Sequence, residues 1–267
     1  MLPATADAAY AALRKRGLAL LRGAFPVSVI DAVYREFLAR FGHMDRQQMS
    51  DEAAKPPPNP FLEVGTGRFD IAPRMTGAFG AHEFFANPLL TRFLTPLLGE
   101  DMRLSDFTVV VSHPGADQQH IHRDHGHLFA EPSMGSYLPA YAINVAVPLI
   151  DVDLETGPTG VWPGSHLWPA HMTPAPETIT RVPFQRGDCL MVDYRTLHAG
   201  LANRSTRIRP ILYLVFVRTW FFDEVNFLRR ASLNMTMDEY EALPEHVRPL
   251  LQRAFSQALR AQQVRTA

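Results

Sequence analysis

The sequence lacks several features that would assign it to particular classes of protein. It contains one cysteine, Cys189, so an internal disulfide is excluded and a reducing compartment is favoured. Its formal net charge is -1, which gives no electrostatic reason to expect a nucleic acid or an anionic membrane as partner. No apolar run reaches the roughly 20 residues that cross a bilayer, and the first residues do not resemble a signal peptide. We therefore expect a cytoplasmic protein.

The remaining composition favours a globular chain with a large core. Of its 267 residues, 46% are hydrophobic, and no repeat or flexible linker divides them, so we expect one domain over 1–267. Apolar residues recur at helical spacing in several parts of 1–100 and in 232–262, whereas short β-branched and apolar runs separated by turn residues fill 104–222. This order predicts a mainly β core, of jelly-roll or barrel type, with flanking helices.

Capping residues predict where several helices begin. The pairs that can cap a helix start are Ser28 with Asp31, Asn87 with Pro88, and Thr236 with Glu239. Pro244 predicts a further start, and the apolar face that follows can pack on the core or form a dimer contact, so we expect a monomer or a homodimer. Residues 44–86 show no sustained period, which indicates an irregular segment that is either a lid over a site or a tolerated insertion.

The stretch from Gln119 to Phe129 reads Gln-His-Ile-His-Arg-Asp-His-Gly-His-Leu-Phe and is rich in metal-ligand atoms. On an extended chain His122 and Asp124 lie two residues apart and point to the same side. A third ligand must come from elsewhere, and His198 is the best candidate. Two histidines and one carboxylate on one face of an octahedron leave three positions open, as in non-haem Fe(II) oxygenases.

Arg209 stands at the start of the apolar run 210–217. A buried guanidinium is costly unless an anion accompanies it, and its planar fork suits a carboxylate. The position of Arg209 therefore predicts an anionic ligand near the expected metal.

The other histidines of the stretch leave an alternative open. His120 shares a strand face with His122, so the two could bind zinc together with His125 or His127. That reading leaves Asp124 and Arg209 unexplained. More simply, these histidines line the substrate entrance or hold the metal ligands in place.

Several motifs together carry a family resemblance over about residues 17–222. They are Gln119-x-x-His122-x-Asp124, the run Gly-Pro-Thr-Gly-Val-Trp-Pro-Gly-Ser-His over 157–166, and His198 followed by Arg209. As a set they resemble the phytanoyl-CoA dioxygenase family of Fe(II)/2-oxoglutarate oxygenases. The resemblance implies a double-stranded β-helix of the cupin-like kind, in which His122, Asp124 and His198 bind Fe(II). It also implies 2-oxoglutarate as co-substrate, with its far carboxylate paired with Arg209, and O2 as oxidant.

The resemblance also implies secondary contacts and a reaction class. Gln119 is expected to reach the co-substrate, and Asn144 needs a polar partner that is either a 2-oxoglutarate carboxylate or a backbone group. Gly200 stands where many members have Ser or Thr, and Ala146 where many have an aromatic residue, so the contacts around the co-substrate are expected to differ. Because Asp124 is present, the chain resembles the hydroxylases of the family rather than its halogenases.

The substrate is expected to be a small molecule. Without an evident cluster of Lys and Arg for CoA phosphates, a natural-product or amino-acid-like compound is favoured over an acyl-CoA ester. Arg123, Phe129, Tyr137 and Trp162 are candidates for its pocket by proximity in sequence. Desaturation, cyclisation and epimerisation remain alternatives to hydroxylation, and a cupin-like binding protein without turnover is the alternative from another class.

Overall fold

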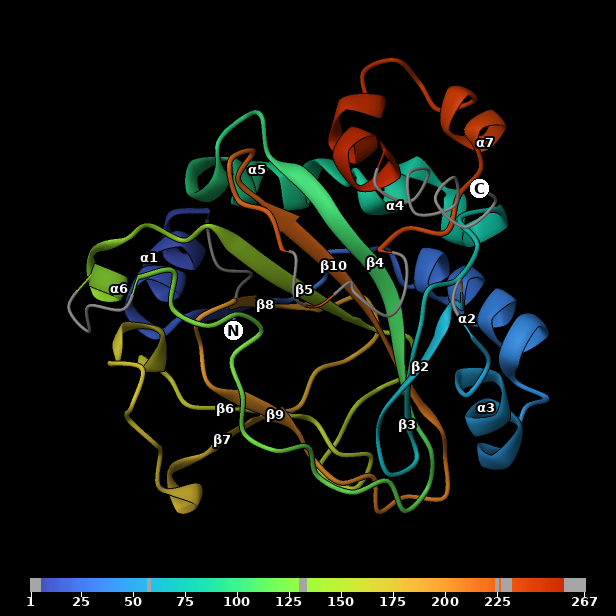
Figure 1. Ribbon diagram of the computed structural model, residues 1–267, viewed down its shortest axis with the longest axis horizontal. Helices are drawn as coiled ribbons and strands as arrows, with labels where there is room; N and C mark the ends of the chain where they lie inside the picture. Colours follow the sequence, from blue (N-terminus) through green and yellow to red (C-terminus); the bar gives the residue numbers. More distant parts are fainter. Residues whose placement is uncertain (1–5, 57–58, 130–133, 224–225, 227–231, 257–267) are drawn as a thin grey trace.

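A computed structural model describes residues 6–56, 59–129, 134–223, 226 and 232–256 (Figure 1). The first half of the chain contains α1 (Ala6–Arg16), β1 (Leu18–Leu21), α2 (Val27–Phe41), α3 (Arg46–Ala53), β2 (Phe61–Gly65), β3 (Arg68–Ile71), η1 (Gly77–Gly80), α4 (His82–Phe85), α5 (Pro88–Leu98) and β4 (Arg103–Ser112). The second half contains α6 (Met134–Tyr137), β5 (Ala142–Pro148), β6 (Thr159–Val161), η2 (Ser165–Leu167), η3 (Pro176–Thr178), β7 (Thr180–Val182), β8 (Cys189–Asp193), β9 (His198–Gly200), β10 (Arg209–Val217) and α7 (Met237–Glu241).

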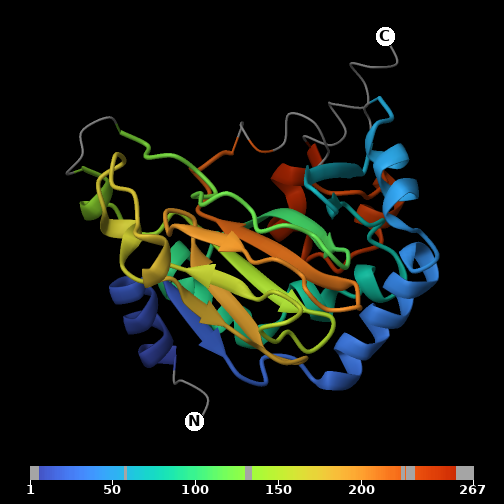
Figure 2. The ribbon, with the colours of Figure 1, turned by 90° about the horizontal axis from the view of Figure 1, so that it is seen from below.

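The strands form two antiparallel sheets that face each other. The larger sheet has seven strands in the order β1-β8-β5-β10-β4-β3-β2, and the smaller has three in the order β7-β6-β9. Figure 2 shows the smaller sheet lying across one face of the larger. This is the expected jelly roll, with the long strands β4 and β10 paired along its centre from Arg209↔Ser112 to Val217↔Arg103.

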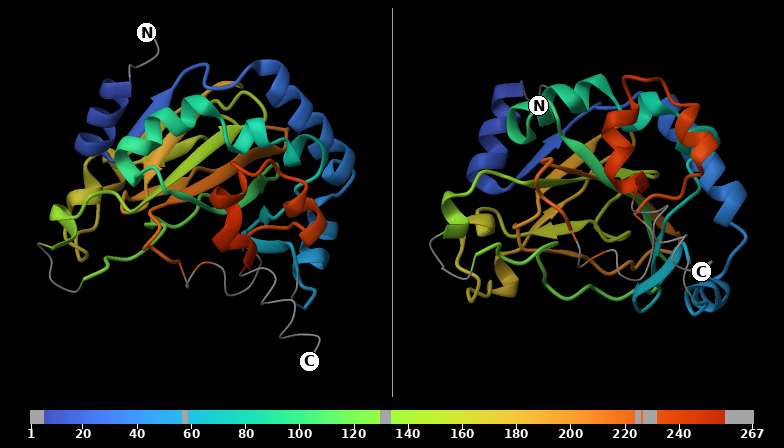
Figure 3. Two further views of the ribbon diagram at one scale, coloured as in Figure 1. Left: turned by 90° about the horizontal axis from the view of Figure 1, so that it is seen from above. Right: turned by 45° about the horizontal axis from the view of Figure 1, so that its top comes forward.

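Helices cover the other face of the larger sheet. Viewed from above, α1, α2, α4 and α5 lie over it (Figure 3). Their buried side chains, such as Phe37 of α2 and Leu94 of α5, join those of Phe107 and Val109 of β4 in the main hydrophobic core. Because the core occupies this face, the space between the two sheets is left for a binding site.

Two of the three predicted caps are confirmed. The Asn87 side chain accepts hydrogen bonds from the backbone N–H groups of residues 89 and 90 at the start of α5. Thr236 and Glu239 form the predicted capping box of α7. The two helices thus begin where their sequences provide a side-chain acceptor.

The predicted capping box of Ser28 and Asp31 is wrong. Helix α2 begins at Val27, with Pro26 at the N-cap position and no capping side chain. The fixed φ of proline favours a helix start at once, and the Pro26 carbonyl accepts hydrogen bonds from the N–H groups of Val29 and Ile30. Ser28 therefore lies inside the first turn, not before it.

The expectation of an irregular segment over 44–86 is also wrong for most of its length. It contains α3, the β2–β3 hairpin, η1 and α4. The hairpin extends the edge of the larger sheet, where Arg68 pairs with Ser112 and Ile71 with Val109 of β4. This segment therefore contributes part of the barrel wall rather than an insertion outside it.

The C-terminal helical face packs on the core. Residues 248–256 are helical, so this helix begins four residues after Pro244. Val247, Leu251 and Phe255 are buried in the same core as the strands, whereas Leu259, expected on this face, lies outside the described residues. In the part of the chain that the structure describes, no helix is long and apolar enough to cross a membrane.

Candidate active site

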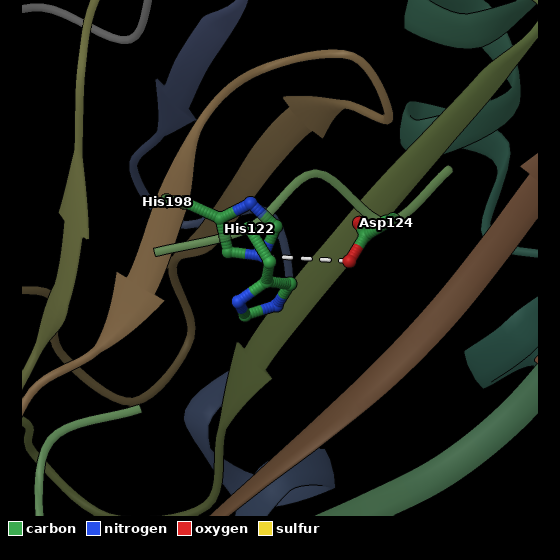
Figure 4. A group of neighbouring side chains, drawn as sticks. All are labelled: His122, Asp124 and His198. Carbon is green, nitrogen blue, oxygen red and sulfur yellow. Dashed lines mark ion pairs between the residues drawn. The ribbon is translucent and has the colours of Figure 1, made fainter. Parts of the chain in front are cut away.

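His122, Asp124 and His198 come together between the two sheets, as predicted (Figure 4). One ligand atom from each residue lies within 4.8 Å of the other two. His198 belongs to β9, and its backbone pairs with that of His122 through N–H···O bonds of 3.0 and 2.9 Å. In addition the Asp124 N–H donates to the Tyr194 carbonyl, so backbone pairing holds the 122–124 stretch against the 194–198 segment.

Both histidine rings are oriented by backbone carbonyls. Nδ1 of His122 lies 2.8 Å from the His120 carbonyl, and Nδ1 of His198 lies 3.0 Å from the Thr196 carbonyl. A proton on Nδ1 that is donated in this way leaves Nε2 with its lone pair, the arrangement usual for histidines that bind metals. Nε2 of His198 lies 3.4 Å from the Asp124 carboxylate.

The charges at the triad favour a cation there. Burial alone would raise the pKa of Asp124, but the contacts with His198 and His122 and the hydrogen bond from Asn144 outweigh it, so the pKa is lowered. Burial and the neighbouring His198 lower the pKa of His122 to about 4. At neutral pH the site therefore presents a carboxylate and at least one neutral imidazole, which is a donor set for a divalent metal.

Asn144 holds the metal-site carboxylate. Its Nδ2 donates to Oδ2 of Asp124 over 3.1 Å, while its Oδ1 is buried without a hydrogen-bond partner. Asp124 is neither of the two partners expected for Asn144. The position of Asn144 on β5 brings its side chain to the Asp124 carboxylate. Contact of Asn144 with the co-substrate stays a prediction.

The second feature of the site is a pair of buried arginines, Arg209 of β10 and Arg68 of β3. Each is 1% exposed, and both donate to the Ser112 hydroxyl over 2.6 Å. Arg209 also donates to the Gly157 carbonyl, and Arg68 to backbone carbonyls that include Leu201. Among the described residues neither arginine forms an ion pair, and the Nε atom of each is buried without a hydrogen-bond partner.

Two cations buried side by side without an anion are energetically unfavourable. Burial and the charge of Arg68 lower the pKa of Arg209 to about 9, and burial lowers the pKa of Arg68 as well. A bound carboxylate would supply the missing charge and accept hydrogen bonds from both planar forks. The geometry therefore fits the prediction that Arg209 binds an anionic ligand.

Arg68 was not foreseen from the sequence. A signal was present, because the turn residues Gly65-Thr-Gly67 stand between the short apolar runs 61–64 and 69–71 and indicate a hairpin. Once that hairpin is paired with β4, Arg68 lies opposite Ser112 and next to Arg209.

Gly200 is explained by close approach. A Cβ atom there would lie 2.5 Å from Oε1 of Gln119 and 2.8 Å from Nη1 of Arg68. The Gln119 side chain accepts a hydrogen bond from the Gly200 N–H over 2.9 Å, which turns it inward from a segment outside the strands. The Arg68 guanidinium thus occupies the space that a Ser or Thr side chain at position 200, expected in many family members, would fill.

A cavity of about 380 Å³ joins the triad and Gln119 to the surface. Its further walls come from β2, β3, β4, β6 and β10, and they include Leu62, Val110, Thr159 and Tyr213. This volume lies within the range of small-molecule sites.

The other candidates for the substrate pocket lie in different places. Arg123 lines the cavity, yet its guanidinium donates to the backbone carbonyls of Arg195 and Ser165 and so ties the 122–124 stretch to neighbouring segments. Phe129, Tyr137 and Trp162 are not among the cavity-lining residues, and Trp162 is buried with its indole N–H on the Ala175 carbonyl.

The histidine-rich zinc alternative finds no support in the geometry. In the described part of the chain, the triad is the only group of three His, Cys, Asp or Glu residues placed to hold a metal. His120 lies against the His122 ring at 5.0 Å, and His125 against Tyr141 and Phe221.

Comparison with known proteins agrees with this arrangement. The family model for phytanoyl-CoA dioxygenase (PhyH) matches residues 6–211. The chain belongs to the phytanoyl-CoA dioxygenase family. The PhyH match includes all three residues of the triad and Arg209.

Curated proteins and solved structures also resemble this chain, at low sequence identity. The dioxygenase aneA of Aspergillus aculeatus is 31% identical over 170 residues, which are 61% of this chain and 56% of that protein. The multifunctional dioxygenase prhA of Penicillium brasilianum is 28% identical over 253 residues, 88% of this chain and 78% of that protein. The epimerase SnoN, solved with Fe3+, alpha ketoglutarate and nogalamycin RO, has a TM-score of 0.59 at 20% identity and covers 80% of this chain and 83% of its own.

Proposed function

We propose that this protein is an Fe(II)- and 2-oxoglutarate-dependent oxygenase that hydroxylates a C–H bond of a small molecule and releases succinate and CO2. The observation that carries the proposal is the meeting of a His-Asp-His triad with two buried arginines that have no acidic partner among the residues that the structure describes. Membership of the PhyH family supports it, as does the co-substrate named in the SnoN complex.

Different residues of the site fit Fe(II) and 2-oxoglutarate. His122, Asp124 and His198 offer two nitrogens and one oxygen, which suits ferrous iron and leaves positions for the 2-oxo acid and O2. Arg209 and Arg68, with Ser112 between them, suit the far carboxylate of 2-oxoglutarate. Bound iron would supply the oxidative chemistry, which decarboxylates the 2-oxo acid and provides an oxidant for the C–H bond.

The protein's own contribution is position and exclusion of water. Asn144 and the backbone carbonyls of His120 and Thr196 hold the ligands in one orientation. The guanidinium pair fixes one end of the co-substrate, so its other end is directed toward the triad. The aliphatic side chains of Leu62, Val64 and Val110 then leave an apolar side of the cavity for the substrate.

The substrate class remains a proposal. The SnoN complex, which contains nogalamycin RO, supports a small-molecule substrate, and a natural-product or amino-acid-like molecule is preferred to an acyl-CoA ester. Desaturation and epimerisation begin at the same kind of C–H bond and are the nearest alternatives. A cytoplasmic location, a single domain and a monomer or homodimer likewise stay predictions.

Anaerobic titration tests the proposal directly. Fe(II) and 2-oxoglutarate added together should give a weak visible charge-transfer band with the wild type and none with His198→Ala. Admission of oxygen should then release succinate, even slowly and without a substrate. A band without succinate favours a cupin-like binding protein, whereas no band with the wild type overturns the assignment. Activity that persists without oxygen and 2-oxoglutarate would favour a zinc hydrolase.

A further inference from the structure

A second cavity, of about 370 Å³, lies at the end of the molecule where α1 and α6 are found (Figure 1). Its walls come from α1, α5, α6, η2 and the chain at the ends of β8 and β10. Among the described residues, none lines both this cavity and that of the metal triad. Asp193 and Arg195 line the second cavity, whereas Tyr194 between them lines the first. The two cavities are therefore separate and lie on different sides of this segment.

Two arginines fix the shape of the second cavity. Nη1 of Arg195 donates to the Leu138 carbonyl over 2.8 Å. Arg218 donates from Nε to the Ala140 carbonyl over 2.9 Å and from Nη2 to the Leu97 carbonyl over 2.6 Å. These bonds attach the wall that contains Leu138 and Ala140 to the strand ends and to α5. Because its walls are held in this way, the cavity is present before a ligand binds, and binding needs little ordering of the chain.

The charges of the second cavity leave two cations unmatched. Asp193 is the only acidic residue among the described residues that line it, and Arg195 pairs with its carboxylate through bonds of 2.9 and 2.7 Å. Arg14 and Arg218 also line the cavity, and neither forms an ion pair with another described residue. Burial lowers the pKa of His166, so this lining residue adds no charge at physiological pH. The cavity therefore attracts an anion.

Arg14 and Arg218 both retain hydrogen-bond donors. Backbone carbonyls accept from Nε and Nη2 of Arg218, which leaves its Nη1 without a partner among the described residues. The Arg14 side chain is exposed, and its Cζ lies 5.7 Å from the centre of the Tyr10 ring. It forms no hydrogen bond with any residue that the structure describes. Guanidinium groups with free N–H donors are well suited to bind a carboxylate.

The remaining walls of the second cavity are largely apolar or aromatic. Leu13 and Leu97 are buried beside it, and Pro96 and Leu167 also line it. Tyr137 lines the cavity although 83% of it is exposed, so its ring lies at the open side. A ligand that fills this space therefore needs an apolar body as well as an anionic group.

We propose that this cavity is a second binding site, and that its ligand is a small organic acid with one carboxylate on an apolar or aromatic body. Arg14 and Arg218 bind the carboxylate, and the body lies against Leu13 and Leu97. The ligand is neither the co-substrate nor the compound that is oxidised, because the cavity does not reach the metal ligands. The proposal thus goes beyond the oxygenase function and does not depend on it.

Calorimetric titration with 2-naphthoate and 2-naphthamide separates the charge from the apolar body. The two compounds have nearly the same shape, but the amide is uncharged. With Ni(II) and 2-oxoglutarate present to fill the active site, the acid should bind roughly tenfold more tightly than the amide, since it gains hydrogen bonds to charged groups. Inorganic phosphate, which has no apolar body, should bind more weakly than 2-naphthoate.

Three variants locate the bound acid. Arg14→Gln should weaken 2-naphthoate binding roughly tenfold and leave 2-naphthamide unchanged. Arg16→Gln is the matched control, because it removes the same charge from the same turn of α1 but does not line the cavity, and it should change the affinity less than about twofold. Ala140→Leu fills the cavity without removal of a polar side chain and should weaken the acid and the amide alike.

Several results would overturn the proposal. They are no binding of 2-naphthoate to the wild type, equal affinities for the acid and the amide, phosphate bound as tightly as the acid, or unchanged binding in Ala140→Leu. Melting temperatures show whether each variant is folded, and Leu167→Trp fills the same cavity from a 41% exposed position should Ala140→Leu prove unstable. The anaerobic Fe(II)/2-oxoglutarate band should be equal in the wild type and Arg14→Gln. Its absence from the wild type would contradict the oxygenase assignment alone.

Discussion

The charged residues of the site are divided between two ends. At one end Asp124 faces His122 and His198, and at the other Arg68 and Arg209 share a hydroxyl acceptor. A metal cation suits the first end and a carboxylate the second, so a single ligand with an anionic tail and a chelating head satisfies both. Of the two ends, the arginine end is the one that is unfavourable without a bound anion.

Ligand-dependent stability tests the arginine end. A dicarboxylate that removes the repulsion between Arg68 and Arg209 should raise the melting temperature of the Fe(II) protein. The gain is about 2.7 kcal/mol when free ligand is a hundredfold above its dissociation constant. 2-Oxopentanoate, which lacks the far carboxylate, should stabilise much less. With Arg209→Met, the two acids should raise the melting temperature by the same amount. With Arg181→Met, on the exposed side of β7, 2-oxoglutarate should still raise it more than 2-oxopentanoate does. An unchanged difference in Arg209→Met would contradict the carboxylate seat.

Metal binding should weaken as the solution is acidified. Burial lowers the pKa of His198, but the Asp124 carboxylate and the hydrogen bonds to the ring outweigh it, so the pKa is raised. Protons and metal compete for the same Nε2 lone pair. Metal affinity is therefore full above the raised pKa of His198 and falls as the pH drops through it. Competition of Ni(II) with a coloured chelator from about pH 8 to about pH 6 measures this, and a flat affinity over that range would contradict the competition.

Among the elements, those with a clear apolar pattern were predicted, including the four-residue strand β1, whereas short strands with polar residues were not. Helix α5 has a capping asparagine, a first-turn proline and a full apolar face, and the prediction placed its start correctly. The four-residue strand β3 carries Arg68 and Asp70 on the side that faces the cavity, so its sequence is as polar as that of a loop. Strand β9, of three residues, is likewise too short for any period. Polar residues that serve the site thus interrupt the apolar pattern of a short strand, so the pattern does not predict the strand.

Strand β9 also sets a steric requirement that can be tested. Gly200→Ala would place a methyl group against Gln119 and the Arg68 guanidinium, and crowding of this kind typically costs about 1–3 kcal/mol. We expect Gly200→Ala to weaken 2-oxoglutarate binding because Arg68 must move, with little effect on Fe(II) affinity. Gly126→Ala is the matched control, since a Cβ atom there meets nothing within 4 Å. Equal titration curves for the two variants would show that Arg68 has room to adjust.

Across the whole molecule, one core joins the helical ends of the chain to the barrel. Ala9 and Leu13 of α1, Phe107 of β4, and Leu251 and Phe255 near the C-terminal end belong to the same buried cluster. The triad lies on the other side of the larger sheet from this cluster. The sequence predicted the helices and their apolar faces, but which faces meet is decided by contacts far apart in the chain, which local patterns do not reveal.

A single core predicts a single unfolding transition, and this tests the one-domain prediction. Leu251→Ala removes a fully buried side chain of the C-terminal helix and should lower the free energy of unfolding by about 2–5 kcal/mol. If the chain unfolds as one unit, the loss should appear equally in far-UV circular dichroism and in the Fe(II)/2-oxoglutarate band during urea titration. Leu89→Ala, at a 37% exposed position of α5, should change little. Should Leu251→Ala instead melt part of the helical signal while the band survives unchanged, the C-terminal helix would be a separate unit resting on the barrel.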